Sequence, residues 1–169
     1  LIETRAPSGE SWYDLGYYKP ETLDRRIEAA AADHLSDPIL FSAGDDVVET
    51  TIGDLLHDAS AVAASLWALG VRAGDRIAIH LPNWREALLL YLGALRIGAV
   101  SVPIVPTFGD AETRFILKDS GARALFCPNR FRGRDYASQC NAYLAEGLID
   151  TLIPVDPLGD GNSAAPWRS

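Results

Sequence analysis

Three arginines close together are the side chains in this sequence best suited to chemistry. Arg130, Arg132 and Arg134 occur within the run NRFRGRDY, directly after a predicted strand. Arginine forks match the geometry of phosphate oxygens, so this loop could bind a phosphate group. The alternative is a solvated loop in which Asp135 offsets part of the charge, and composition alone favours that alternative.

The rest of the sequence offers no catalytic residue and no set of metal ligands. It contains no P-loop, no dinucleotide-binding glycine motif, no nucleophile elbow and no HExxH motif. The three histidines are dispersed. His80 follows a predicted strand at the end where α/β ligand sites gather, yet a satisfied structural histidine is the favoured interpretation.

Composition predicts an ordinary globular chain. With 169 residues, 48% of them hydrophobic, the chain is long enough to form one domain with a core. A net charge of −8 argues against a nucleic-acid partner, which needs a basic surface. There is no 18-residue apolar run and no signal peptide, and the two cysteines, Cys127 and Cys140, are too few for a disulfide framework or a zinc site. We therefore expect no membrane span and a cytoplasmic location.

The elements that would position the arginines centre on residues 70–106, GVRAGDRIAIHLPNWREALLLYLGALRIGAVSVPIVP. The alternation over residues 76–81 predicts a strand, which Pro82 ends. The apolar run over residues 99–104 predicts a continuous buried strand of a parallel sheet.

A helix over residues 84–97 connects these two strands. Asn83 can cap it, and Glu86 follows three residues later, so a reciprocal capping box is available. The helix is apolar at nearly every position and is therefore expected to be buried. Gly98 supplies its left-handed cap.

Shorter predicted helices and strands lie before and after this unit. Because strands alternate with helices along the chain, we expect an α/β fold with a parallel sheet. Thr51 and Asp54 open a helix whose apolar stripe includes Leu55, Ala59, Val62, Leu66 and Leu69. The other expected elements are a helix over 22–34, a hairpin over 38–50 with a Gly44-Asp45 turn, a helix over 110–120 capped by Asp110, a strand over 124–126, a loop and helix over 131–146, and a strand over 151–155. We expect an irregular N-terminal arm (1–20), an α/β unit (21–155) and a linker or tail (156–169).

The run over residues 70–106 closely resembles the N-terminal part of the adenylate-forming acyl-CoA synthetases. That superfamily has G-V-x-x-G-D-R-V-A-I-x-L-P-N-x-x-E followed by G-A-x-x-x-G-A-V-x-V-P-I-x-P. The fold that the resemblance implies is the parallel-sheet subdomain of the large N-terminal domain of these enzymes, with a small N-terminal hairpin.

The resemblance also implies a role for the arginines. FRGRDY is similar to the F-R-G-x-D-Y run of medium-chain and cyclohexanecarboxylate-type CoA ligases. Acetyl-CoA synthetases carry a similar arginine–glycine–arginine loop that contacts the nucleotide phosphates of CoA, which implies CoA contacts for Arg130, Arg132 and Arg134. Thr107 stands where some benzoate-type ligases have an arginine that reaches CoA, although threonine lacks the charge.

Members of the superfamily use ATP and Mg²⁺ to convert a carboxylic acid to an acyl-adenylate and then transfer the acyl group to CoA. Their glycine-rich phosphate loop and C-terminal lysine motif are absent here, and the chain begins with Leu and lacks Met. We therefore expect an N-terminal fragment that is inactive alone and binds none of these cofactors tightly. The resemblance implies as partners a small-molecule carboxylic acid, CoA and the remainder of the AMP-binding domain; a homodimer stays open.

Two alternatives to a CoA ligase remain at this point. Fatty acyl-AMP ligases and the adenylation domains of peptide synthetases share this region, although FRGRDY favours a CoA ligase. A stand-alone flavodoxin-like binding module is the alternative from a different class, and it predicts a complete binding cleft made wholly from these residues.

Overall fold

A four-stranded parallel sheet forms the centre of the computed structural model, which describes residues 7–43 and 46–157. Its strands are β3 (Arg76–Ile79), β4 (Val100–Pro103), β5 (Ala124–Pro128) and β8 (Thr151–Val155), in the spatial order β4-β3-β5-β8. Both neighbours of β3 run parallel to it. The predicted α/β fold with a parallel sheet is therefore confirmed.

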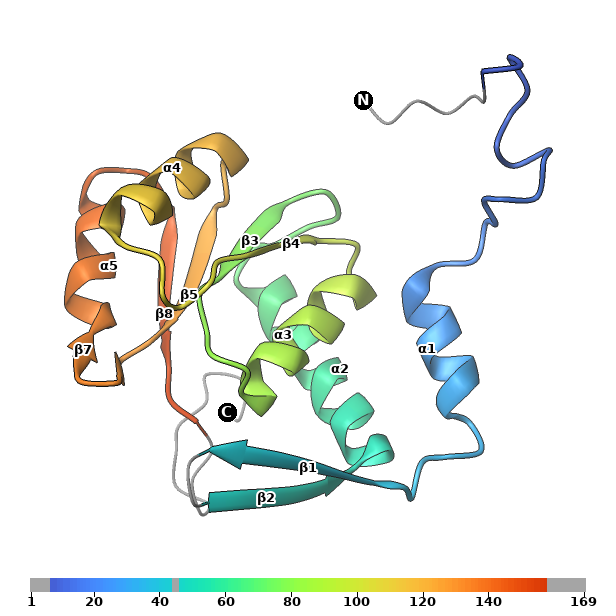
Figure 1. Cartoon of the computed structure of the whole chain (residues 1–169), viewed down its shortest axis with the longest axis horizontal. Helices are drawn as coiled ribbons and strands as arrows, with labels where there is room; N and C mark the ends of the chain where they lie inside the picture. The colour runs from blue at the N-terminus through green and yellow to red at the C-terminus, as the bar shows by residue number, and fades with distance from the viewer. Residues whose placement is uncertain (1–6, 44–45, 158–169) are drawn as a thin grey trace.

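Helices cover both faces of this sheet (Figure 1). One core contains α2 (Ile52–Ala68) and α3 (Arg85–Arg96), and the other contains α4 (Asp110–Ser120) and α5 (Tyr136–Ala145). The sheet is thus doubly wound, and the strand order reverses between β3 and β5. Crevices at such a reversal, outside the carboxyl ends of the strands, are where α/β proteins bind ligands.

The helix α2 begins at the position that Thr51 and Asp54 predicted. Thr51 is the N-cap, and its hydroxyl accepts a hydrogen bond from the Asp54 amide at 3.1 Å. The apolar stripe is buried except at Leu69, which is 44% exposed. Leu69 lies past the last helical residue, so the helical period no longer applies to it and its predicted burial is wrong.

The predicted caps of α3 and α4 are wrong. The N-cap of α3 is Trp84, because the Trp84 amide donates to the Pro82 carbonyl at 2.7 Å and the chain stays extended one residue longer than predicted. Asn83 is consequently exposed and caps nothing. The N-cap of α4 is Gly109, which places Asp110 in the first turn, where its carboxylate binds other side chains.

The strand predicted as fully buried, β4, is partly exposed. Val100 is 48% exposed, and within the described residues β4 pairs on one side only, with β3. Residues on an edge strand keep access to solvent even when their sequence is apolar.

The N-terminal segments form small units beside the sheet. Thr22 caps α1 (Leu23–Ala31), which ends earlier than predicted. The predicted hairpin is confirmed as β1 (Pro38–Ala43) and β2 (Asp46–Thr51), while the predicted turn residues 44–45 lie outside the described residues. Residues 7–20 contain no helix and run away from the sheet in Figure 1. None of the helices described is both long and apolar enough to cross a membrane.

Candidate functional site

Three segments meet at the carboxyl edge of the sheet, because β3, β4 and β5 are parallel. They are residues 80–84 after β3, residues 104–109 after β4 and residues 130–135 after β5. Thr107 and the three arginines, although separated in sequence, therefore belong to one edge of the fold. This edge is also where the strand order reverses.

The arginine run folds as a short hairpin rather than the loop expected from the sequence. We call residues 130–135 the arginine hairpin: β6 (Arg130–Phe131) pairs antiparallel with β7 (Arg134–Asp135). The connecting residues Arg132 and Gly133 have φ values of +49° and +79°, and positive φ at both central residues is the signature of a type I′ turn. Gly133 was the available sequence signal for this two-residue turn.

Arg134 points back into the protein and holds two of the segments together. Its guanidinium donates to the Phe108 carbonyl at 3.1 Å and to the Gln139 side-chain oxygen. It also lies 4.7 Å from the centre of the Tyr136 ring. The Tyr136 hydroxyl donates to the Pro106 carbonyl at 2.7 Å, so residues 104–109 are anchored once to the arginine hairpin and once to the first residue of α5.

Arg130 and Arg132 differ from Arg134 because both are exposed. The Arg132 guanidinium lies 5.3 Å from the Phe131 ring, and among the described residues it takes part in no hydrogen bond or salt bridge. Thr107 is exposed as well. The hairpin thus presents two cations to solvent beside Thr107, while its third arginine has a structural role.

Asp135 offsets only part of this positive charge. Its carboxylate caps α5 by accepting the Ser138 amide at 2.9 Å. That hydrogen bond, helped by the nearby Arg130, holds the pKa of Asp135 below its ordinary value. The carboxylate is therefore ionised at neutral pH and engaged mainly with the helix.

Aromatic rings form the floor behind the hairpin. His80 is 1% exposed and lies edge-to-face on Tyr136, with ring centres 5.3 Å apart. Trp84 packs on Phe131 in the same manner at 5.8 Å, which connects the start of α3 to the hairpin. Neither imidazole nitrogen of His80 bonds a nitrogen or oxygen atom within the described part of the chain. The prediction of a satisfied structural histidine is therefore wrong.

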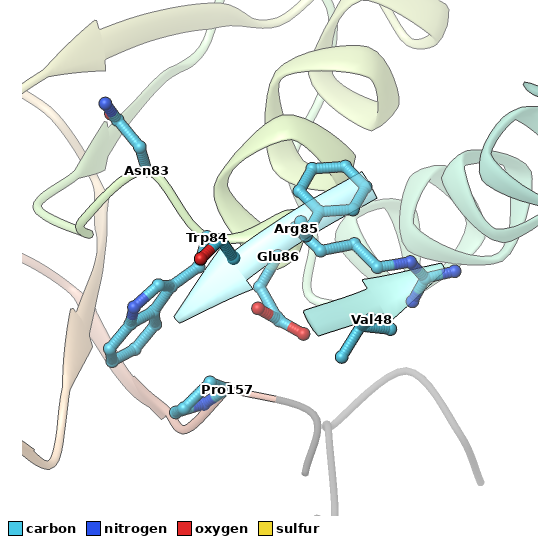
Figure 2. Close-up of a pocket in the computed structure, with 8 residues that line it drawn as sticks. Val48, Asn83, Trp84, Arg85, Glu86 and Pro157 are labelled. Atoms are coloured by element: carbon cyan, nitrogen blue, oxygen red, sulfur yellow. The ribbon is translucent and has the colours of Figure 1, made fainter. Parts of the chain in front are cut away.

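A small cavity lies on the other side of Trp84, between the start of α3 and the β1–β2 hairpin. Figure 2 shows Trp84, Arg85 and Glu86 at this place, with Val48 and Pro157 opposite. Its volume is about 30 Å³, room for no more than a few water molecules. Arg85 forms a partly buried ion pair with Asp58, which ties α3 to α2. This cavity is a packing gap and is too small for an organic substrate.

Comparison with known proteins identifies relatives of the chain. The family described as "AMP-binding enzyme" matches residues 27–162. The medium-chain fatty-acid–CoA ligase of Escherichia coli is 43% identical over 82 residues, which cover 48% of this chain and 14% of the relative. The acetyl-coenzyme A synthetase of Paraburkholderia phymatum is 32% identical over 128 residues, covering 74% of this chain and 19% of the relative.

Solved structures show the same arrangement of strands and helices. A fatty acyl CoA synthetase of Mycobacterium tuberculosis superposes with a TM-score of 0.69 at 28% identity, over 80% of this chain and 26% of that one. A long-chain-fatty-acid-CoA ligase of Archaeoglobus fulgidus superposes with a TM-score of 0.72 over 87% of this chain and 29% of that one; at 23% identity this likeness concerns the fold alone. The chain thus spans less than a third of each of these relatives.

Proposed function

The chain belongs to the family of AMP-binding enzymes, and on that premise we propose that it is the N-terminal part of an ATP-dependent ligase that joins a fatty-acid-type carboxylic acid to CoA through an acyl-adenylate. The observation that carries the proposal is the match over residues 27–162, which includes the whole parallel sheet, together with relatives named as acid–CoA ligases. We place this ligase in the cytoplasm, where the chain's two free thiols are ordinary.

Adenylation is the chemical reason for ATP in such a reaction. A carboxylate is a poor acyl donor, and conversion to an acyl-adenylate gives it a good leaving group. Among the described residues no three His, Cys, Asp or Glu side chains are grouped so that they could hold a metal ion, so no step here is assigned to Mg²⁺. The sequence also lacks a glycine-rich phosphate loop, and we assign ATP to none of its residues.

The part of the reaction that we assign to this chain is recognition of CoA. Arg130 and Arg132 present exposed guanidiniums, which suit the phosphates of the CoA nucleotide. Thr107 lies on the neighbouring segment and can offer a hydroxyl. Arg134 acts indirectly: by bonding the Phe108 carbonyl it keeps the segment that carries Thr107 next to the hairpin.

Titration of the 169-residue chain with CoA, extended to concentrations that detect weak binding, tests this assignment. Arg132→Ala should weaken CoA binding roughly tenfold or more, since one charge-assisted hydrogen bond contributes about 1.5–3 kcal/mol. Arg25→Ala is the matched control, because Arg25 is an exposed arginine on α1, outside the arginine hairpin. Equal binding by both variants would contradict the proposed CoA site.

The ligase activity itself is tested in a longer protein that contains this chain. We expect exchange of pyrophosphate into ATP that depends on a fatty acid, followed by thioester formation with free CoA. Arg132→Ala should raise the KM for CoA and leave the exchange nearly intact, because adenylation precedes the use of CoA. Thioester formation on a carrier protein and not on CoA would favour an acyl-AMP ligase or a peptide-synthetase domain instead.

A further inference from the structure

The only two cysteines of the chain lie in the same core, between the sheet and α5. Cys127 is in β5 and Cys140 is in α5, and both are free and buried, at 0% and 1% exposure. The amides of Tyr136 and Ala137 donate to the Asn129 carbonyl at 3.1 and 3.3 Å, which fixes the first turn of α5 against the end of β5. Cys140 follows one helical turn after Tyr136, so it faces the same strand. The two thiols share a hydrogen bond.

A buried imidazole completes this cluster. His80 lies beside Cys140, and its ring nitrogens bond no nitrogen or oxygen atom within the described residues. The hydrogen bond from Cys127, with a smaller effect of His80, lowers the pKa of the Cys140 thiol against the opposing effect of burial. The hydrogen bond to Cys140 and burial raise the pKa of Cys127. Of the two thiols only Cys140 has the imidazole of His80 as a neighbour to accept its proton, so we assign Cys140 as the nucleophile.

We propose that Cys127 and Cys140 form a reversible disulfide by exchange with a small disulfide such as oxidised glutathione, with His80 accepting the first proton. α5 opens locally, and the Cys140 sulfur attacks one glutathione sulfur while its proton passes to His80. The glutathione S–S bond breaks, the departing glutathione thiolate takes up a proton, and Cys140 carries a mixed disulfide. The Cys127 sulfur then attacks Cys140, and the second glutathione thiolate leaves with the Cys127 proton. Two protein thiols are oxidised and one glutathione disulfide is reduced to two thiols.

The bond would enclose the arginine hairpin. Residues 130–135 lie between Cys127 and Cys140, so the disulfide closes a short loop that contains all three arginines. It would fasten α5 to β5 at the base of that hairpin. This modification site goes beyond the proposed ligase function and does not depend on it.

Equilibrium with a glutathione redox buffer tests the proposal on the wild-type chain. The reduced chain is incubated with reduced and oxidised glutathione, once in native buffer and once in urea. Free thiols are then alkylated under denaturing conditions, and intact mass spectrometry measures the fraction of chain that carries the disulfide. Because the fold holds the two thiols together, the native equilibrium constant for the intramolecular disulfide should exceed the value in urea at least tenfold. A ratio below ten overturns the proposal, since the fold would then not favour the bond.

Single variants test the order of the steps. Cys127→Ser should accumulate a glutathione adduct at Cys140 faster than Cys140→Ser accumulates one at Cys127, and the reverse order would overturn the assignment of the nucleophile. His80→Gln should slow adduct formation at Cys140 at least fivefold, whereas His57→Gln, at an exposed histidine of α2, should leave it unchanged. Equal rates in the two histidine variants would remove His80 from the mechanism. Circular dichroism verifies that each variant is folded. If a variant does not fold, the equilibrium measured on the wild-type chain still tests the proposal.

Discussion

At the scale of single residues, Arg132 stands out because its backbone is in a conformation that arginine rarely adopts. It is the only non-glycine residue described with a positive φ, +49°, and it occupies the first central position of a type I′ turn. Asn or Gly suits that position better, so the turn is less stable with arginine there than it could be. An arginine held in this unfavourable conformation at an exposed tip supports the proposed binding role.

Arg132→Asn should therefore change stability and CoA binding in opposite directions. We expect the free energy of unfolding to rise by about 1 kcal/mol, because Asn tolerates the left-handed region, and CoA binding to weaken with loss of the charge. Urea denaturation and calorimetric titration measure the two effects. Arg130→Asn is the matched control: its backbone has no positive φ, so it should weaken CoA binding without the gain in stability. Lower stability in Arg132→Asn would contradict this account of the turn.

Asp110 provides a pH-dependent contact between α4 and α5. Its carboxylate accepts hydrogen bonds from Arg114 at 2.7 Å and from the Tyr143 hydroxyl at 2.9 Å. These bonds, led by the one from Arg114, hold the pKa of Asp110 below its ordinary value of 3.8. The unfolded chain consequently takes up this proton at a higher pH than the folded chain does.

The contribution of Asp110 to stability should be complete above its ordinary pKa and should disappear as the pH falls through the lowered pKa of the folded state. Asp110→Asn cannot titrate, so its stability should fall less steeply than that of the wild type from pH 4 downward. Urea midpoints measured between pH 7 and pH 2.5 give the comparison. Parallel curves for the two proteins would show that Asp110 does not contribute to the pH dependence.

At the scale of elements, the contact of α2 with α3 depends on the absence of a side chain. A Cβ atom at Gly93 would lie 2.8 Å from the Val62 side chain and 3.1 Å from the Ala63 amide nitrogen. The backbone of α2 is too rigid to move away without loss of other contacts. A glycine at this helical position is therefore explained by packing and not by flexibility.

Gly93→Ala should destabilise the protein, although alanine in place of glycine stabilises an ordinary helix position by about 1 kcal/mol. We expect a loss of about 1–3 kcal/mol in the free energy of unfolding, as for other overpacked cores. Val62→Ala should cost less stability in the Gly93→Ala background than in the wild type, because there it also removes the nearest clashing atom. Independent, additive effects in this double-mutant cycle would contradict the packing explanation.

At the scale of the whole molecule, the described residues hold a candidate CoA-facing edge and no phosphate loop for ATP. We expect the 169-residue chain neither to bind ATP with micromolar affinity in the presence of Mg²⁺ nor to release pyrophosphate from ATP and a fatty acid. Calorimetry and a pyrophosphate assay measure this, with circular dichroism as the control that the preparation is folded. Micromolar ATP binding would mean that the nucleotide site lies within this chain.

Local patterns in the sequence determined most of the secondary structure and the fold class. The order of strands and helices, the parallel sheet and the start of α2 at Thr51 all depend on residues within a few positions of one another, which is the range over which hydrophobic period and capping act. The recognisable run over residues 70–106 indicated the family for the same reason.

Contacts between distant segments decided what the sequence could not. Arg134 and Phe108 are 26 positions apart, and only the parallel arrangement of β3, β4 and β5 brings them together and turns that arginine away from solvent. The exposure of Val100 depends on the place of β4 at an edge, which strand order sets and apolar content does not. Trp84 and not Asn83 is the N-cap of α3, because the hydrogen bond from the Trp84 amide to the Pro82 carbonyl shifts the helix start by one residue. A side chain's type is local information, whereas its partners depend on which segments the fold makes neighbours.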